Sequence, residues 1–236
     1  MPPASDRLNV ARRIGTISAI GGALAVATAL LLLWSIRLHT LPRSMYVSEF
    51  GAEGEVTAEL FEAALLLIVA GGAVTAIVVR DIRSTAPVLR AWRPMLSLLV
   101  ACGFFLIASQ VTCTAGCPLP VGTTFTWQDF VHTLCAVLAF AAACWGMLQL
   151  SFAQGHRGLA RFSLVSALAV GLIAAAGGIL SLARFGTDVG SWLELVATTI
   201  ALCWLLVTAL AVSALSGRGV AEPVRGPLVV ARAWRR

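Results

Sequence analysis

Acidic residues are concentrated in one short segment of this 236-residue chain, because residues 44–63 hold five of its eleven acidic residues. Three more groups that exchange protons, Asp129, His132 and Glu194, stand near the starts of later apolar runs. A histidine beside a buried carboxylate can titrate near neutral pH, as general acid–base chemistry requires. The five acidic residues of the segment are Glu49, Glu53, Glu55, Glu59 and Glu62.

Helix geometry accounts for part of this acidic segment. Glu55, Glu59 and Glu62 have the spacing of one helical face, and an acidic side chain at a helix N-terminus is stabilised by about 0.3–1 kcal/mol. Glu62 and Glu194, however, lie about one turn inside apolar runs, where a charge is costly and normally faces the interior of a bundle. Two interpretations stay open: an ion-pair cluster that fixes helix packing, and a ligand pocket or proton-handling site. The polar cluster is predicted from Glu62, Asp129, His132, Arg184 and Glu194.

Two of the six cysteines, Cys113 and Cys117, lie together in a polar connection between apolar runs. A location outside the cytoplasm favours a disulfide, and we predict one between them. The same two cysteines with His132 and His39 have the ligand types of a zinc site. The spacing supports that alternative only weakly, so we expect no metal and no cofactor. The other four cysteines lie in apolar runs and are expected to pack there.

The elements that must position these residues are membrane helices. The chain is 59% hydrophobic and 12% charged, with a mean hydropathy of +0.91, whereas a soluble domain carries about 25% charged residues. Six apolar runs have about the length that crosses a bilayer as a helix. We therefore predict an all-α, polytopic integral membrane protein with one six-helix domain over residues 14–215 and basic tails at 1–13 and 216–236. The runs are 14–36, 58–79, 94–112, 129–150, 162–183 and 191–215.

The first run has a second interpretation, a cleaved signal peptide, with "ALAVATA" as its small-residue site. Three arginines followed by a long apolar run suit an uncleaved first helix better. If all six runs span, 14 of the 17 arginines lie on one side of the membrane. The positive-inside rule then predicts that both termini are cytoplasmic. Anionic lipids satisfy the net charge of +6, so we expect membrane lipids as partners and no nucleic acid.

At "YVSEFGA" the chain resembles the bacterial membrane family catalogued as domain of unknown function 998. The matching positions are Ser48, Glu49, Phe50 and Gly51 after the first run, then His132, Arg184 and Glu194. Phe50 stands where the family usually has leucine. The resemblance covers about residues 14–215 and implies a multi-pass protein of the bacterial cytoplasmic membrane, with six helices and no established reaction.

Three functions fit these residues. Familiar nucleotide-binding, serine-hydrolase and zinc-protease motifs are absent from the sequence. This absence favours a non-enzymatic envelope protein that associates with lipids or with a protein partner in the membrane. The first alternative is an intramembrane hydrolase of a lipid or envelope substrate, with Ser48, Glu49, His132 and Glu194 as candidate catalytic residues. The second alternative is a small proton-coupled transporter that uses Glu62, His132 and Glu194.

Overall fold

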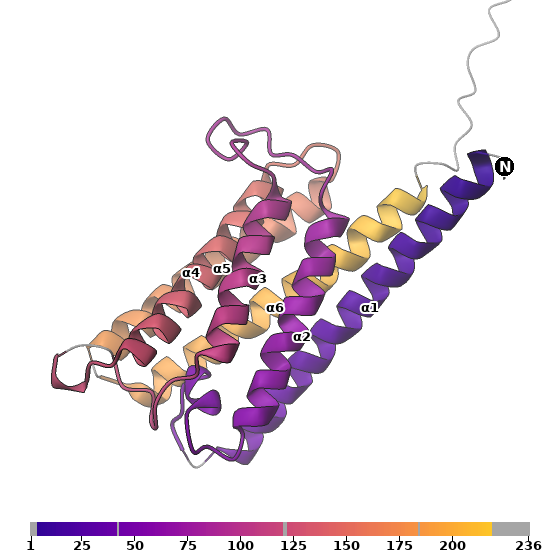
Figure 1. The fold of residues 1–236 in the computed structure, drawn as a ribbon. Helices are drawn as coiled ribbons and strands as arrows, with labels where there is room; N and C mark the ends of the chain where they lie inside the picture. Colours follow the sequence, from indigo (N-terminus) through magenta and orange to yellow (C-terminus); the bar gives the residue numbers. More distant parts are fainter. Residues whose placement is uncertain (1–3, 42, 120–121, 184, 219–236) are drawn as a thin grey trace, which may run out of the picture.

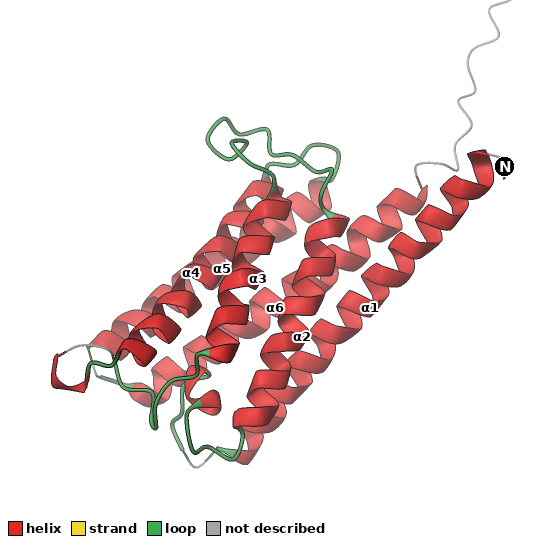
Figure 2. Ribbon diagram, viewed as in Figure 1, coloured by secondary structure: helices red, strands yellow, loops and turns green. Residues whose placement is uncertain are grey.

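The chain folds into six α-helices, and the computed structural model describes residues 4–41, 43–119, 122–183 and 185–218 (Figure 1). No β-strand occurs in these ranges (Figure 2). A single bridge there joins Ser84 and Ala153. The predicted all-α class is therefore confirmed. The helices are α1 (Ala4–His39), α2 (Ala58–Val78), α3 (Pro94–Gln110), α4 (Trp127–Ser151), α5 (Arg157–Leu182) and α6 (Thr187–Arg218), with short 3-10 helices η1 (Ser48–Gly51) and η2 (Gly122–Thr124).

Five of these helices are long and apolar enough to cross a membrane, and α3 is shorter, with 17 residues. Seventeen residues extend about 25 Å at 1.5 Å per residue, which is the short end of the spanning range. α1 begins at Ala4, ten residues before the predicted apolar run. No glycine or proline separates Ala4 from that run, so the helix continues through the residues predicted as a polar tail.

The helices form a ring of neighbours. α1 packs on α2, and each following helix packs on the next, until α6 returns to α1; α2 also contacts α6 across the ring. The start of α1 and the end of α6 lie at the same end of the bundle (Figure 1). We call the opposite end, which carries η1, η2 and the α5–α6 turn, the distal end. The candidate polar residues that the structure describes belong to this end.

Paired glycines explain how closely some helices pack. A Cβ atom on Gly71 of α2 would lie 2.7 Å from the Gly22 carbonyl oxygen of α1. A Cβ atom on Gly72 would lie 2.7 Å from Cys102 Sγ of α3. Small residues therefore bring α2 against both neighbours, as is usual between membrane helices.

Candidate functional site

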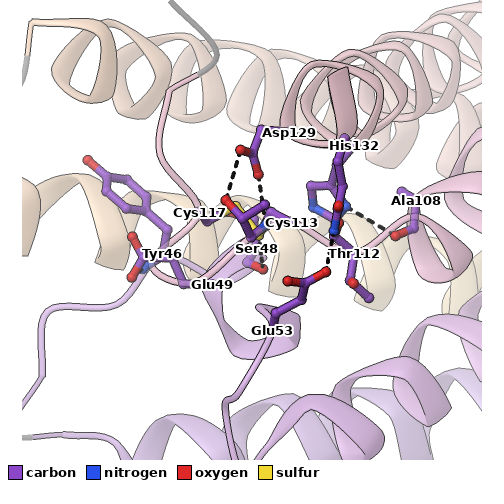
Figure 3. Close-up of a disulfide and its surroundings, with 12 residues drawn as sticks. Tyr46, Ser48, Glu49, Glu53, Ala108, Thr112, Cys113, Cys117, Asp129 and His132 are labelled. Atoms are coloured by element: carbon purple, nitrogen blue, oxygen red, sulfur yellow. Dashed lines mark hydrogen bonds between the residues drawn. A yellow bond between two sulfur atoms is a disulfide. The ribbon is translucent and has the colours of Figure 1, made fainter. Parts of the chain in front are cut away.

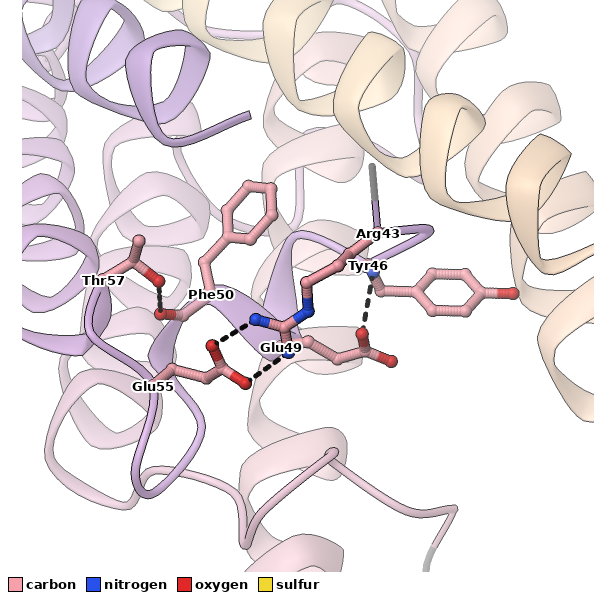
Figure 4. A network of polar contacts seen from close by, with 6 residues as sticks. All are labelled: Arg43, Tyr46, Glu49, Phe50, Glu55 and Thr57. Atoms are coloured by element: carbon pink, nitrogen blue, oxygen red, sulfur yellow. Dashed lines mark hydrogen bonds and ion pairs between the residues drawn. The ribbon is translucent and has the colours of Figure 1, made fainter. Parts of the chain in front are cut away.

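The segment between α1 and α2 folds back across the distal end of the bundle. Arg43 donates two hydrogen bonds to Glu55, with N–O distances of 2.9 and 2.6 Å, on the exposed side of this segment (Figure 4). This pairing raises the pKa of Arg43 and lowers the pKa of Glu55. On the other side, Phe50 of η1 is fully buried and meets Phe61 of α2 edge-on at 6.2 Å. A Cβ atom on Gly51 would overlap the Phe61 ring, so this contact requires glycine.

Two side chains fix the start of η1. Glu194 Oε2 accepts a hydrogen bond of 2.8 Å from the Val47 N–H. Arg37 donates to the Met45 carbonyl oxygen at 3.1 Å and lies 4.4 Å from the centre of the Trp192 ring. Both α1 and α6 therefore hold the backbone that carries Ser48 and Glu49. Arg37 was not among the predicted site residues, because a single arginine at the end of an apolar run resembles an ordinary membrane-interface residue.

Tyr46 and Glu49 are held by short-range contacts beside α6. The Tyr46 N–H donates to Glu49 Oε2 at 3.3 Å (Figure 4). Burial raises the pKa of the Glu49 carboxyl, and this hydrogen bond opposes part of the rise. The Tyr46 ring lies against Gly190 of α6, where a Cβ atom would overlap the hydroxyl. The hydroxyl is buried near Ser181 and, within the described residues, makes no well-aligned hydrogen bond. Burial is the largest cause of the rise in the pKa of Tyr46.

His132 lies in the second turn of α4 with its ring buried. Its Nδ1 is 2.7 Å from the Val111 carbonyl oxygen and 3.1 Å from that of Ala108, at the end of α3. Both partners only accept hydrogen bonds, so Nδ1 carries the hydrogen, and in the neutral ring Nε2 keeps the lone pair. The imidazole therefore presents Nε2 as its acceptor.

The predicted disulfide between Cys113 and Cys117 is confirmed in the connection between α3 and α4 (Figure 3). Asp129 holds this connection against the start of α4. Its carboxylate accepts from the Thr114 N–H at 2.8 Å, from the Thr114 hydroxyl at 2.9 Å and from the Thr126 hydroxyl at 2.5 Å. Asp129 thus positions the disulfide loop, and its side chain is fully buried in that role.

A cavity of about 850 Å³ opens beneath this distal layer, between α4, α5 and α6. Its lining changes from polar near the distal end to apolar deeper in the bundle, where Phe140 and Cys144 of α4 face Gly171 and Ala174 of α5. A second cavity of about 90 Å³ lies among α2, α3, α4 and α6 and shares Ser48, His132 and Glu194 with the first. All four candidate catalytic residues, Ser48, Glu49, His132 and Glu194, line the larger cavity.

The other predicted members of the polar cluster lie elsewhere. Glu62 accepts a hydrogen bond of 3.1 Å from Gln110 at the end of α3 and does not line either cavity. Asp129 accepts hydrogen bonds from the disulfide loop. Arg184 lies outside the described residues. Within the described ranges the ion pairs are Arg43–Glu55 and Arg80–Asp81. The described contacts of Glu194 are therefore with backbone, not with a cation.

The arrangement can bind an elongated molecule and exchange protons with one end of it. The candidate acid and base groups gather at the distal end, and the cavity that they share runs into the apolar part of the bundle. Sequence reasoning identified these four residues but not the cavity that connects them.

Comparison with known proteins gives one match, to a protein family. No curated protein and no solved structure matches the chain. The pattern of one family matches residues 19–211, which cover most of the six-helix bundle from α1 into α6. The chain therefore belongs to the family described as Protein of unknown function (DUF998).

Proposed function

We propose that this protein binds a lipid-like amphiphile in the cavity between α4, α5 and α6, as a lipid-associated factor of the bacterial cytoplasmic membrane. The main support for this proposal is that the lining of one cavity changes from polar at the distal end to apolar deeper in the bundle. Ser48, Glu49, His132 and Glu194 offer hydrogen bonds at the distal end, and the deeper lining is apolar. The arginine distribution favours an extracytoplasmic distal end. The head group would lie there, with the hydrocarbon chain along α4 and α5.

The dimensions suit one hydrocarbon chain. Ligand pockets usually measure about 300–1,000 Å³, and this cavity measures about 850 Å³. The lining residues of α4 run from His132 to Cys144, which is roughly 18 Å at 1.5 Å per residue. That length exceeds half of the ~30 Å hydrocarbon core of a bilayer. The chain of a lipid from the distal leaflet would therefore remain at its natural depth.

Small residues on α5 keep this cavity open. Gly171, Ala174, Ala175 and Gly178 share one face of the helix and line the cavity. A Cβ atom added at Gly171 or Gly178 would meet nothing within 4 Å. Gly71 and Gly72 of α2, in contrast, contact the neighbouring helices closely. The small residues of this α5 face thus leave space instead of bringing helices together, and Gly171, Ala175 and Gly178 are exposed.

Filling this space tests the proposal. Gly171→Phe and Ala175→Phe place an aromatic ring in the cavity, and Leu172→Phe is the matched control, because Leu172 is 72% exposed and does not line the cavity. The three variants are purified in mild detergent, and co-purified lipid is quantified by mass spectrometry. We expect the first two to lose most of a lipid species that wild type and Leu172→Phe retain. Equal lipid content in all four proteins would refute binding in this cavity.

Hydrolysis of the bound lipid is the second candidate, because Ser48, His132 and the two glutamates line the same cavity. In the described part of the chain, however, the Ser48 hydroxyl makes no hydrogen bond to His132. A nucleophile and its base normally lie about 2.6–3.2 Å apart, although free enzymes often show longer distances. Binding is therefore better supported than catalysis. Ser48→Ala distinguishes binding from hydrolysis. If the protein is a hydrolase, this variant should still bind the lipid but should no longer release a cleavage product.

A proton-coupled transporter has less support. Such a protein needs polar groups that continue toward the end of the bundle opposite η1. Beyond Phe140, the described lining of the larger cavity is Ala141 and Cys144 on α4 and small apolar residues on α5. Glu62, one of the three residues assigned to that function, pairs with Gln110 outside both cavities.

A further inference from the structure

Cys113, Cys117 and His132 bring three possible ligands for a soft metal ion close together. The sulfur atoms of Cys113 and Cys117 and a ring nitrogen of His132 all lie within 4.8 Å of one another. Ligands of a tetrahedral zinc ion with Zn–S bonds of about 2.3 Å stand roughly 3.8 Å apart. Small side-chain rotations would therefore bring these atoms to coordination distance once the disulfide is open.

The hydrogen bonds of His132 leave its other ring nitrogen available to a metal ion. Its Nδ1–H donates to the carbonyl oxygens of Ala108 and Val111, so Nε2 carries the free lone pair. Metal-binding histidines usually donate their second ring N–H to a carbonyl or carboxylate, which fixes both the tautomer and the ring. The end of α3 provides this support without any metal present.

Contacts other than the disulfide also hold the two cysteines in place. The Glu53 N–H donates to the Cys113 carbonyl oxygen at 3.0 Å, and the Cys117 N–H donates to that of Thr114 at 2.8 Å. Asp129 binds Thr114 between them with two hydrogen bonds. We therefore expect both thiols to stay beside His132 after the disulfide is reduced.

We propose that reduced Cys113 and Cys117, together with His132, form a binding site for a thiophilic divalent ion such as Zn²⁺. Thiolate and imidazole are ligands that zinc prefers. A small-molecule or protein dithiol reduces the disulfide by exchange and becomes a disulfide itself, leaving two cysteine thiols. Binding of the ion then releases two protons, because thiolates are the ligands. The oxidised pair has no thiolate, so disulfide and metal exclude each other.

The fourth coordination position would face the larger cavity. Cys117 and His132 both line this cavity, as do Glu49 and Ser48. Three protein ligands with a fourth position open to water or to a ligand are typical of reactive zinc sites. The redox state of the cysteine pair would thus determine whether the polar end of the cavity holds a metal ion. This inference does not depend on lipid binding.

A cobalt titration tests the site in the full chain. Protein in detergent is reduced with dithiothreitol, freed of reductant under nitrogen and titrated with Co²⁺. We expect one Co²⁺ per chain with thiolate-to-cobalt charge-transfer absorption, and loss of that absorption when Zn²⁺ is added. The oxidised protein is the matched control with an identical sequence, and it should show no such absorption. Cys203→Ser, at an exposed free cysteine on α6, should behave as wild type.

Variants and a protection assay complete the experiment. Cys113→Ser/Cys117→Ser and His132→Gln should each lose stoichiometric binding. In the reduced wild type, Zn²⁺ should slow the alkylation of Cys113 and Cys117 by at least about tenfold. Absence of the charge-transfer band in reduced wild type, or an equal band in the double variant, would overturn the proposal. If reduction alone unfolds the protein, Zn²⁺ present during reduction should keep it folded, and unfolding in its presence would count against the site.

Discussion

Replacement of Glu194 distinguishes an ion pair from a backbone hydrogen bond at the centre of the site. Its carboxylate accepts a hydrogen bond of 2.8 Å from the Val47 N–H, which fixes the start of η1. Glu194→Gln keeps an acceptor of the same shape and removes the ionisable carboxyl. Glu194→Ala removes the acceptor and leaves the Val47 N–H without this hydrogen bond.

The two substitutions should lower the free energy of unfolding by different amounts. A hydrogen bond to a charged group contributes about 1.5–3 kcal/mol and a neutral one about 0.5–1.5 kcal/mol. Glu194→Gln should therefore cost about 1 kcal/mol at most, since the loss of a partly desolvated charge offsets part of the difference. Glu194→Ala should cost about 1–3 kcal/mol, the penalty for an unpaired buried N–H. For a chain of this length, 1 kcal/mol corresponds to about 2–4 °C in melting temperature.

Thermal melting in detergent measures both effects. We expect Glu194→Gln to lower the melting temperature by no more than about 4 °C and Glu194→Ala to lower it further. Glu62→Gln is the control, because Glu62 contacts exposed Gln110 and should shift melting little. Breaking a buried ion pair costs about 3–5 kcal/mol, so a fall of 6 °C or more in Glu194→Gln, by the same scale, would refute the reasoning. Such a fall would show that a cation pairs with Glu194.

Three further predictions concern the same distal layer. Gly190→Ala should lower the melting temperature, because overpacking against Tyr46 costs about 1–3 kcal/mol. The control Gly171→Ala should not lower it, because a Cβ atom at Gly171 would meet nothing within 4 Å. Burial raises the pKa of Glu49, so its protonated form favours folding: this stabilisation is present at low pH and is lost as the pH rises through the folded-state pKa. Glu49→Gln should therefore flatten the dependence of melting temperature on pH in that range, and an unchanged curve would contradict the assignment. Asp129→Ala should cost about 1–3 kcal/mol and speed reduction of the disulfide by a dithiol, measured by thiol alkylation; an unchanged rate would show that the loop is held by other contacts.

Local rules predicted much of this architecture. The six helices follow from apolar runs of bilayer length, because a backbone in lipid must satisfy its own hydrogen bonds. The pairing of Cys113 with Cys117 was predicted because the two residues lie close together in one loop. The acidic residues at the start of α2 were likewise explained by helix electrostatics, and the distal position of Ser48, Glu49, His132 and Glu194 followed from the order of the spans.

Only the tertiary structure decided which of these groups meet and what lies between them. Glu62 lies only a few residues beyond the helix start, yet it turns toward Gln110 and leaves the cluster, whereas Glu194 joins Ser48 from a distant part of the chain. Side-chain direction depends on the rotation of each helix against its neighbours, which packing of all six helices determines together. The cavity also results from how the six helices pack together. Glycine at positions 71 and 171 looks alike in the sequence, but one brings two helices together and the other leaves a space, because the position of the neighbouring helix differs.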